Sequence, residues 1–402
     1  MKILVVNAGS TTLKYQLFDT TDYRVLAKGN CERIGDGGII GHKVPGREPL
    51  EREVTLNSHA DAAEMVVKLL TDPVYGCIHN LSEINAVGHR IVHGGPTLSS
   101  SVAVDDAVMA ELEKCREIDP LHIPGAIMGI EACLKAIPGV PQVLVFDTAF
   151  HHTMPPEAYT YPIPAELAEK YHIRKYGFHG TSHRYVSGEM IRILGKPAEE
   201  TKIVTCHLGG GSSIAAVRGG KVLDTTMGFT SLDGLVMSTR SGSIDPAAVT
   251  FLMDKEHYTP REMDDILNRK SGLLGIAGMG DCRDLCAAME RGDEKATVAM
   301  KTLCYQIKKY IGAYAAAMGG LDAIVFTAGI GENQAIVRKL ACEGLEFLGV
   351  SFDHAANEAV RRPAPVTKLS TDSSRVAVYL IPTNEELVIA QDTAEIAAKQ
   401  SN

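Results

Sequence analysis

The sequence has no apolar run of the roughly 18 residues that a membrane-spanning helix needs. It opens directly on a strand-like pattern, without the charged segment, the long apolar segment and the cleavage site of a secretion signal. Basic runs and basic patches interleaved with aromatic residues are also missing, and the formal net charge is −9. We therefore expect no membrane partner and no nucleic-acid partner. Tryptophan is absent too, but this excludes nothing.

The nine cysteines are an odd number, scattered along the chain, and only Cys282 and Cys286 lie close together. Their spacing matches no zinc ligand set, so we interpret the cysteines as reduced thiols of a cytoplasmic protein. Two common nucleotide motifs are missing as well. No Gly-x-x-x-x-Gly-Lys-Ser/Thr is present, which excludes a P-loop NTPase, and no Gly-x-Gly-x-x-Gly follows the first strand, which argues against a Rossmann dehydrogenase.

What the sequence does contain is an apolar strand at 203–208 that ends in Gly-Gly-Gly-Ser-Ser. Such a loop offers bare backbone N–H groups to a large anion, because glycine has no Cβ in the way. A tight hairpin turn would explain it equally well. A second copy at 2–12 has the same design, an apolar strand, one polar residue and a small-residue loop ending in hydroxyls. A third strand feeds a glycine loop at 323–333. Two strand–loop–strand units about 200 residues apart indicate a duplicated α/β chain.

Helical spacing of apolar residues predicts helices over 59–70, 104–118, 125–137 and 297–318, the last being the longest. We expect Thr181 or Ser182 to cap a helix that runs to Leu194, and Asn333 to cap the helix after the third loop. The segments 224–246 and 271–284 are predicted to be glycine-punctuated loops. The 402 residues are 45% apolar, which is ample for two domains.

Several side chains are candidates for chemistry at this stage. Arg90 ends a short strand, where it either binds an anion or is simply solvated. Asp147 follows another strand, as a turn cap or as a carboxylate that orients an arginine or a metal. His179 precedes a helix N-terminus, which favours anions. His179 and His183 come with no third ligand of the right type, so we do not expect a zinc site.

Eight motifs in order resemble the acetate kinase family of the actin–hexokinase–Hsp70 superfamily. They are Asn-Ala-Gly-Ser at 7–10 with Leu-Lys-Tyr at 13–15, Gly-His-Arg-Ile-Val-His-Gly-Gly at 88–95, Phe-Asp-Thr-Ala-Phe-His at 146–151, Arg-Lys-Tyr-Gly-Phe-His-Gly-Thr-Ser-His at 174–183, the His207 loop, Thr-Arg-Ser-Gly at 239–242, Phe-Thr-Ala-Gly-Ile-Gly-Glu-Asn at 326–333 and Thr-Asn-Glu-Glu at 383–386. The resemblance spans the whole chain. It implies reversible transfer of the ATP γ-phosphoryl group to acetate, in line, giving acetyl phosphate and ADP.

The resemblance also implies roles for individual residues. Catalytic roles fall to Arg90, Asp147, His179 and Arg240, with His122 as a further phosphate-side candidate. The acetate would contact Arg90 and an apolar pocket of Val92, Leu121, Phe178 and Ser231. The nucleotide would contact Lys14, His207, Leu208, Gly209, Gly210, Gly211, Ser212, Asp281, Cys282, Arg283, Gly329, Ile330, Gly331 and Asn333. Mg²⁺ or Mn²⁺ would lie near Asn7 and Glu385, with Glu386 as the alternative carboxylate.

The sequence departs from the family pattern at several positions. Gly210 stands where Asn is usual, which removes a donor to phosphate worth about 1 kcal/mol. Ser231 stands where Pro is usual, Ser238 where Gly is usual, and Thr11 and Thr12 where Ser is usual. The loop before Asp281 is one residue short. Because Ser231 brings a hydroxyl to the acetate pocket, we expect a changed acyl preference or weaker acetate binding.

The family fold implies two ribonuclease H-like lobes, each on a mixed five-stranded sheet, with the nucleotide in the cleft between them. The first lobe is expected at 1–149 with 383–402, and the second at 150–382. A homodimer through the second lobes is implied, with the helix at 297–318 as the candidate contributor. Two alternatives stay open: a propionate or other short-chain carboxylate kinase, and a non-catalytic nucleotide-dependent switch on the same fold.

Overall fold

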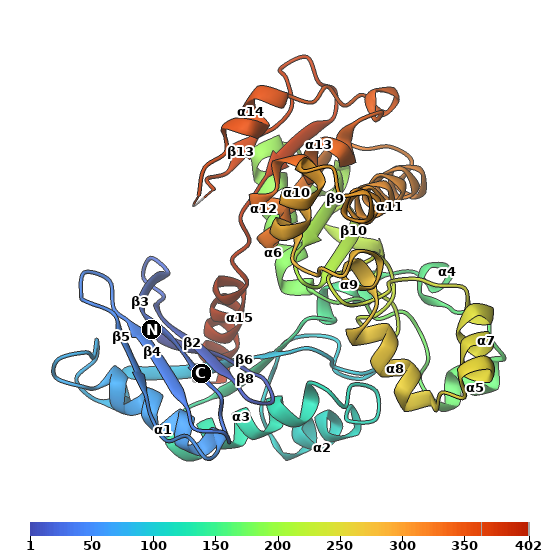
Figure 1. Ribbon diagram of the computed structural model, residues 1–402. Helices are drawn as coiled ribbons and strands as arrows, with labels where there is room; N and C mark the ends of the chain where they lie inside the picture. Colours follow the sequence, from blue (N-terminus) through green and yellow to red (C-terminus); the bar gives the residue numbers. More distant parts are fainter. Residues whose placement is uncertain (363, 401–402) are drawn as a thin grey trace. The chain divides into compact units, whose positions relative to one another are not determined.

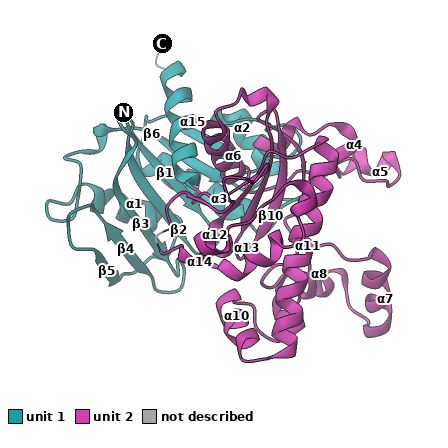
Figure 2. Ribbon diagram, turned by 90° about the horizontal axis from the view of Figure 1, so that it is seen from above, with its two compact units in different colours: residues 1–149, 384–402 teal, residues 150–383 magenta. Residues whose placement is uncertain are grey.

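The computed structural model describes residues 1–362 and 364–400. The chain forms two compact units, Met1–Ala149 with Asn384–Asn402, and Phe150–Thr383 (Figures 1 and 2). Residues 401–402 of the expected first-lobe segment lie outside the described residues. Among the residues described, no helix combines the length and the apolar character that crossing a bilayer requires.

Unit 1 is built on an eight-stranded sheet with the order β5-β4-β3-β2-β1-β6-β8-β7. The strands are β1 Lys2–Ala8, β2 Leu13–Asp19, β3 Arg24–Glu32, β4 Ile39–Lys43, β5 Leu50–Glu53, β6 Ile84–Ile91, β7 Val102–Ala103 and β8 Gln142–Phe146. The helices are α1 His59–Leu70, η1 Leu81–Glu83, α2 Asp106–Lys114, α3 Ile123–Ala136 and α15 Glu385–Gln400. One core lies between the sheet and α1 and α3, and another lies where α15 packs on β1, β6 and β8. The last helix of the chain thus completes the first sheet.

Unit 2 is built on a six-stranded sheet with the order β11-β10-β9-β12-β14-β13. The strands are β9 Lys202–Leu208, β10 Ser212–Arg218, β11 Lys221–Thr225, β12 Ala323–Thr327, β13 Thr367–Lys368 and β14 Ala377–Leu380. The helices are η2 Ala149–Thr153, which crosses the boundary, α4 Pro156–Tyr159, α5 Ala165–Lys170, α6 Gly180–Leu194, η3 Ala198–Glu200, α7 Pro246–Glu256, α8 Pro260–Arg269, α9 Gly272–Ala277, α10 Cys282–Glu290, α11 Glu294–Met318, α12 Ala328–Asn333, α13 Ala335–Cys342, η4 Glu346–Leu348 and α14 His354–Ala359. The 25-residue α11 contributes to the core on one face of the sheet, and α6 to the core on the other.

The two sheets share one topology. In unit 1, β3-β2-β1 pair antiparallel and β1-β6-β8 pair parallel. In unit 2, β11-β10-β9 pair antiparallel and β9-β12-β14 pair parallel. This repeated five-strand order is ribonuclease H-like, so the chain has the predicted duplicated, two-lobed α/β fold. The prediction of five strands per sheet is wrong, because β4, β5 and β7 extend the first sheet and β13 extends the second.

Three local predictions are also wrong. Thr181 and Ser182 lie inside α6, whose N-cap residue is His179 in the left-handed region at φ 57°. Segment 271–284 is not one loop, because α9 buries Leu273 in the core of unit 2 before α10 begins. Asn333 ends α12 and donates to the Gly329 carbonyl, so it does not cap the next helix. In each case, packing overrides a signal that local sequence carries.

Two buried histidines predict that acid destabilises the protein. His89 is hydrogen-bonded to Gln142 (2.7 Å) and His151 to the Phe178 carbonyl (2.8 Å). Burial lowers the pKa of each ring to about 4. The unfolded chain, with histidine pKa values near 6.5, therefore binds more protons as the pH falls from about 6.5 to 4, and each histidine removes up to about 3 kcal/mol of stability across that window.

We expect the urea midpoint to change little between pH 7.5 and about pH 6.5 and to fall from there to pH 5. The variant His89→Gln, which cannot titrate, should show a weaker dependence on pH over the same range. An unmodified protein whose midpoint does not change between pH 7.5 and 5 would contradict the prediction.

Candidate active site

A glycine turn between β9 and β10 lies at the centre of the candidate site in unit 2. The Gly209 N–H donates to the Gly211 carbonyl (3.1 Å), and the Ser212 hydroxyl donates to the Gly209 carbonyl (3.1 Å). A Cβ on Gly211 would lie 3.5 Å from both His179 Nε2 and Arg240 Nη1, whereas a Cβ on Gly210 would meet no atom within 4 Å. The turn therefore brings bare backbone, an imidazole and a guanidinium to one place, which suits an anion.

A cluster of imidazoles and hydroxyls borders this turn. The His179 ring stacks on His207, with centroids 4.0 Å apart and an interplanar angle of 16°. His179 Nδ1 lies 2.9 Å from Ser213 Oγ, and His207 Nδ1 lies 2.8 Å from Ser182 Oγ. Both Nδ1 atoms are thus hydrogen-bonded to hydroxyls, which fixes the plane and direction of each ring.

Arg240 is carried by the segment 226–245, which contains no helix or strand. Its Nη1 donates to the Ser231 carbonyl (3.3 Å). Backbone bonds from Met237 N to the Arg240 carbonyl (3.1 Å) and from Ser271 N to the Thr239 carbonyl (3.1 Å) hold the segment in place. Arg240 is thus fixed by main-chain contacts on a long loop, as expected for a functional loop of this length.

A pocket of about 310 Å³ opens beside the same glycine turn. The segments that line it are distant in sequence and include the turn itself, the start of α10 and helix α12. The predicted nucleotide residues that line it are Gly209, Gly210, Asp281, Cys282, Arg283, Gly329, Ile330 and Asn333. Asp281 is the N-cap residue of α10 and forms an ion pair with Arg283 (2.6 Å), so the two opposite charges are paired at the N-terminus of α10.

Other predicted residues lie elsewhere. His207, Leu208, Gly211, Ser212 and Gly331 belong to the same turns but are not among the residues that line this pocket. Phe178 is buried next to His179, and Ser231 is half-buried on the Arg240 loop.

Unit 1 holds a second group of predicted residues around Arg90. The guanidinium donates twice to the Asp147 carboxylate, from Nη2 to Oδ2 (2.7 Å) and from Nε to Oδ1 (3.1 Å). Asp147 is 1% exposed and the Arg90 side chain 23%. The negative charges of Asp147, Glu385 and Glu386 raise the pKa of Arg90 above its usual value, although burial opposes this. A bidentate, partly buried pair of this kind fixes the plane and direction of the guanidinium.

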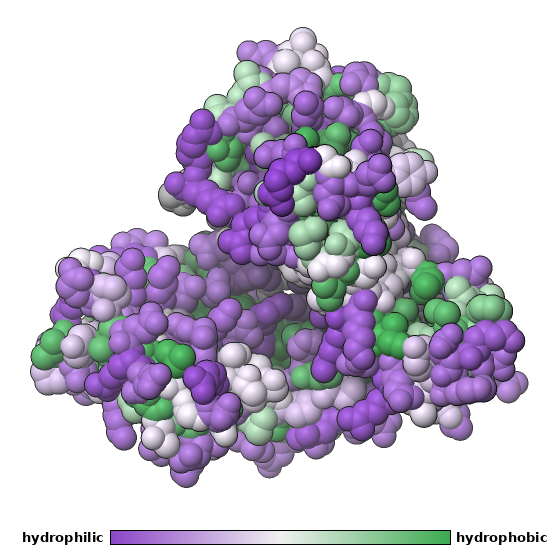
Figure 3. All heavy atoms as spheres, viewed as in Figure 1, coloured by the Kyte–Doolittle hydropathy of each residue, from purple (hydrophilic) through white to green (hydrophobic). Residues whose placement is uncertain are grey.

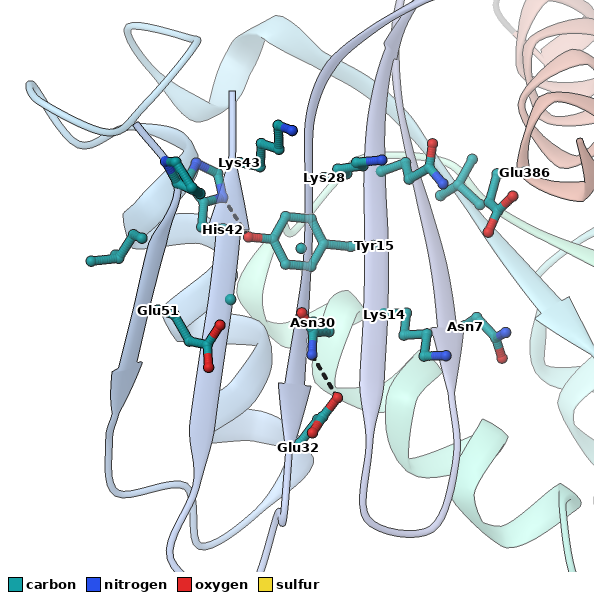
Figure 4. A pocket seen from close by; sticks show the side chains of 16 residues that line it. Asn7, Lys14, Tyr15, Lys28, Asn30, Glu32, His42, Lys43, Glu51 and Glu386 are labelled. Carbon is teal, nitrogen blue, oxygen red and sulfur yellow. Dashed lines mark hydrogen bonds between the residues drawn. The ribbon is translucent and has the colours of Figure 1, made fainter. Parts of the chain in front are cut away.

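A pocket of about 500 Å³ lies on the first sheet, and Figure 4 shows its polar lining. Asn7 at the end of β1, Lys14 on β2 and Glu386 at the start of α15 all line it. The structure therefore divides the two candidate carboxylates: Glu386 lines the pocket with Asn7, whereas Glu385 has the stronger electrostatic effect on Arg90. The remaining predictions of unit 1 lie apart from this pocket. Val92 is half-buried, Leu121 is 52% exposed, and His122 pairs with Asp119 (2.8 Å) at the start of α3.

The residues present suit a magnesium ion that is bound mainly through phosphate. Across the described ranges, no group of three or more His, Cys, Asp or Glu side chains could hold a metal. Mg²⁺ does not need such a cage, because one or two carboxylates together with waters and substrate phosphates suffice. Glu385, Glu386 and the Asn7 carbonyl oxygen are ligands of the appropriate hard type.

Duplicated ribonuclease H-like sheets with glycine turns at their strand ends suit the binding of a nucleotide, and comparison with known proteins identifies the class as an ATP-dependent phosphotransferase, that is, a kinase. The family model described as the acetokinase family matches residues 2–391. The chain belongs to this family. The acetate kinase of Methanosarcina thermophila is 53% identical over 398 residues, 98% of this chain and 97% of that protein. The acetate kinase of Carboxydothermus hydrogenoformans is 52% identical over 401 residues, with full coverage of both.

Solved structures agree with this assignment. The crystal structure of Porphyromonas gingivalis acetate kinase superimposes with a TM-score of 0.94 at 45% identity and covers 98% of this chain and 99% of that one. A propionate kinase from Francisella tularensis gives a TM-score of 0.91 at 39% identity, with the same coverage. The family resemblance deduced from eight motifs is thereby confirmed.

Some residues of these pockets were missed by sequence reasoning. Ser238, Gln334 and Arg362 line the unit 2 pocket, and of these only Ser238 was named from the sequence, as a departure from the family pattern. Ser213 was not singled out and His183 was considered only as a zinc ligand, yet both are hydrogen-bonded in the imidazole cluster. The positions of hydroxyls across a sheet depend on strand register, which the motif pattern does not contain.

Proposed function

We propose that this chain transfers the γ-phosphoryl group of ATP reversibly to acetate, giving acetyl phosphate and ADP. The observation that carries the proposal is that Arg240, His179 and the glycine turn meet at one place, in a chain whose relatives at 52–53% identity are named acetate kinase. Acetate is already ionised at neutral pH and needs no general base. The enzyme must instead cancel charge as two anions approach, and align them.

In this proposal each unit contributes one set of residues to the reaction. Arg90, held by Asp147, binds the acetate carboxylate, with Val92 and Leu121 near its methyl group. Arg240 holds the carboxylate and the transferring phosphoryl group, and His179 donates to that phosphoryl group in the transition state. Phe178 and Ser231 complete the acetate pocket, and His122 remains a further phosphate-side candidate.

The proposed nucleotide contacts come from the family resemblance, and the lining of the unit 2 pocket supports part of them. Gly209, Gly210, Gly211 and Ser212 hold phosphates, together with His207, Leu208 and Lys14. The α12 loop, with Gly329, Ile330, Gly331 and Asn333, holds adenosine, flanked by Asp281, Cys282 and Arg283. We propose Mg²⁺ or Mn²⁺ as the cofactor, near Asn7 and Glu385 or Glu386. When bound, the metal neutralises phosphate charge.

The test is acyl phosphate formation from ATP and acetate, trapped as the hydroxamate. We expect turnover that depends on acetate and on a divalent metal. A protein that binds ATP but forms no acyl phosphate with any short carboxylate would contradict the enzyme proposal and favour the nucleotide-dependent switch.

The acyl preference is a separate prediction, because Ser231 places a hydroxyl beside the acetate pocket and one structural relative is a propionate kinase. We expect propionate to be used appreciably and acetate binding to be weakened by about 1 kcal/mol. The variant Ser231→Pro keeps the carbonyl that accepts from Arg240 and should shift kcat/KM towards acetate. The measurement compares kcat/KM for acetate, propionate and butyrate, with kcat/KM for ATP as the control. A strong and exclusive preference for acetate in the unmodified protein would count against it.

We further propose a homodimer, and the structure favours another surface than the predicted helix. The apolar stripe of α11 is mostly core, and only Val298 and Tyr305 are largely exposed on it. In contrast, α7 has no buried residue, and it exposes Phe251 (59%) and Leu252 (38%). Hydrophobic atoms are visible over this part of unit 2 in Figure 3. An exposed apolar helix of this kind is typical of an interface.

We expect Phe251→Asp to convert a dimer of 43.2 kDa chains into a monomer, measured by light scattering on a sizing column. Tyr305→Asp on α11 is the matched control and should leave the mass unchanged. A dimer that persists in Phe251→Asp, or an unmodified protein that is monomeric, would contradict the assignment. A cytoplasmic location is proposed as well, because all nine cysteines are free thiols.

A further inference from the structure

The hydroxyl of Ser213 lies between two imidazole rings. Ser213 Oγ is 2.9 Å from His179 Nδ1 and 2.8 Å from His183 Nε2. On the far side of that second ring, His183 Nδ1 is 2.7 Å from Thr205 Oγ1. Thr205, His183, Ser213 and His179 therefore form a continuous chain of hydrogen bonds that leads from the core of unit 2 to the glycine turn.

The inner part of this chain is closed to water. His183, Ser213 and Thr205 are all 0% exposed. His151 packs edge-on against His183, with centroids 5.7 Å apart. Burial, with smaller contributions from His151 and His207, holds the pKa of His183 far below its usual value. The ring of His183 is therefore neutral and carries one N–H.

Proton counting then allows two orders. In one order Thr205 donates to His183 Nδ1, His183 Nε2–H donates to Ser213, and Ser213 donates to His179 Nδ1. In the other, every donor is reversed, and the Thr205 O–H is left with only the Ala215 carbonyl, 3.5 Å away. A buried donor without a good acceptor costs stability, so the first order is favoured.

The outer end of the chain meets a cationic neighbourhood. The His179 ring stacks on His207. A Cβ added to Gly211 would lie 3.5 Å from His179 Nε2 and 3.5 Å from Arg240 Nη1. In the favoured order, His179 Nδ1 accepts from Ser213, which only the neutral ring can do. A neutral His179 can donate to a ligand from Nε2 only if its Nδ1 accepts a hydrogen bond, and the first order provides the donor.

We propose that Ser213 is a positioning residue that fixes His179 in the neutral Nε2–H tautomer, so that Nε2 donates to the transferring phosphoryl group. This inference rests on the proposed function for the role of His179, but the tautomer itself does not. The relay from Thr205 through His183 sets the direction in which the Ser213 hydroxyl donates. Catalysis then needs no protonation of His179 on approach of the substrates.

The direct test is long-range ¹H–¹⁵N NMR of the full-length protein labelled at histidine, with His179 assigned by its loss in His179→Gln. We expect the neutral Nε2–H pattern at pH 7.5, and the same pattern at pH 6.5. In Ser213→Ala, the proton should be shared between Nδ1 and Nε2. A His179 ring that is charged, or that carries its proton on Nδ1, in the unmodified protein at pH 7.5 would overturn the proposal, whatever the variants do.

Kinetics give a second readout. In Ser213→Ala we expect kcat to fall roughly 10- to 100-fold, less than the roughly 100- to 1,000-fold cost of losing one preorganised donor outright, with KM for both substrates within about twofold. Ser213→Thr, which retains the hydroxyl, should recover most of kcat. Ser187→Ala removes another buried hydroxyl from α6, which bonds only the Arg184 carbonyl, and should match the unmodified protein.

An unchanged kcat and an unchanged His179 tautomer in Ser213→Ala would also overturn the proposal. If the unmodified protein forms no acyl phosphate, the proposed function fails, while the NMR result still decides the tautomer. The two failures can therefore be told apart.

Discussion

Replacing Arg240 with alanine is expected to lower kcat/KM for acetyl phosphate formation at least about 1,000-fold, roughly 4 kcal/mol of transition-state stabilisation. A Cβ on Gly211 would lie 3.5 Å from both Arg240 Nη1 and His179 Nε2, so Arg240 brings a positive charge to the glycine turn where the phosphoryl group is proposed to bind. In the variant, the Arg240 guanidinium no longer offsets the repulsion between the acetate carboxylate and the phosphoryl group. The hydroxamate assay measures the effect, and ATP binding by calorimetry should change much less.

Two further variants define the Arg240 result. Arg240→Lys keeps the charge but not the planar fork, so it should recover only a small part of the activity. Arg192→Ala removes a 71% exposed arginine from α6 that pairs with Glu189, and it should be fully active. Should Arg240→Ala retain more than about a tenth of the activity, the proposed phosphoryl clamp is wrong.

The second large effect is expected for Asp147→Asn. This carboxylate is 1% exposed and accepts both hydrogen bonds from Arg90. Removing one partner of a fully buried pair costs about 3 to 5 kcal/mol, and here we expect a loss of about 3 kcal/mol, because Arg90 is 23% exposed and also faces the charges of Glu385 and Glu386. We expect the free energy of unfolding to fall by about that amount, and KM for acetate to rise because Arg90 loses its fixed direction.

Urea unfolding and acetate kinetics on the same preparation test this prediction. Asp372→Asn, at a fully exposed carboxylate paired with Lys368, is the control and should change neither quantity. A stability loss without any effect on acetate KM would show that Asp147 supports the fold alone. An unchanged free energy of unfolding in Asp147→Asn would contradict the interpretation that the buried Asp147 carboxylate stabilises the fold by pairing with Arg90.

Periodicity and glycine punctuation predicted much of the fold. Helix α1 begins and ends at His59 and Leu70 as predicted, and α11 ends at Met318 as predicted, followed by the C-cap residue Gly319 in the left-handed conformation at φ 67°. Helices that contribute few apolar residues to a core were not predicted. The α9 segment looks like a glycine loop because its structure depends on Leu273 reaching a core that is built from distant parts of the chain.

The candidate site was predicted to the extent that motifs carry it. The unit 2 pocket gathers Gly209, Asp281 and Gly329 from three loops that the motif analysis had already selected. Arg362 lines the same pocket from a segment without any motif, and the carboxylates Glu385 and Glu386 could be told apart only once α15 was placed. Adjacent residues on a helix point in different directions, so their separate roles follow from the helix orientation.

The placement of α15 has a consequence for how the protein is made. Residues 385–400 form a helix on the sheet of unit 1, so close to β6 that a Cβ on Gly88 would clash with the Thr393 hydroxyl of that helix. The ribosome therefore makes the first 149 residues long before the helix that covers β1, β6 and β8 exists. Until α15 is made, one apolar face of the nascent first unit stays uncovered.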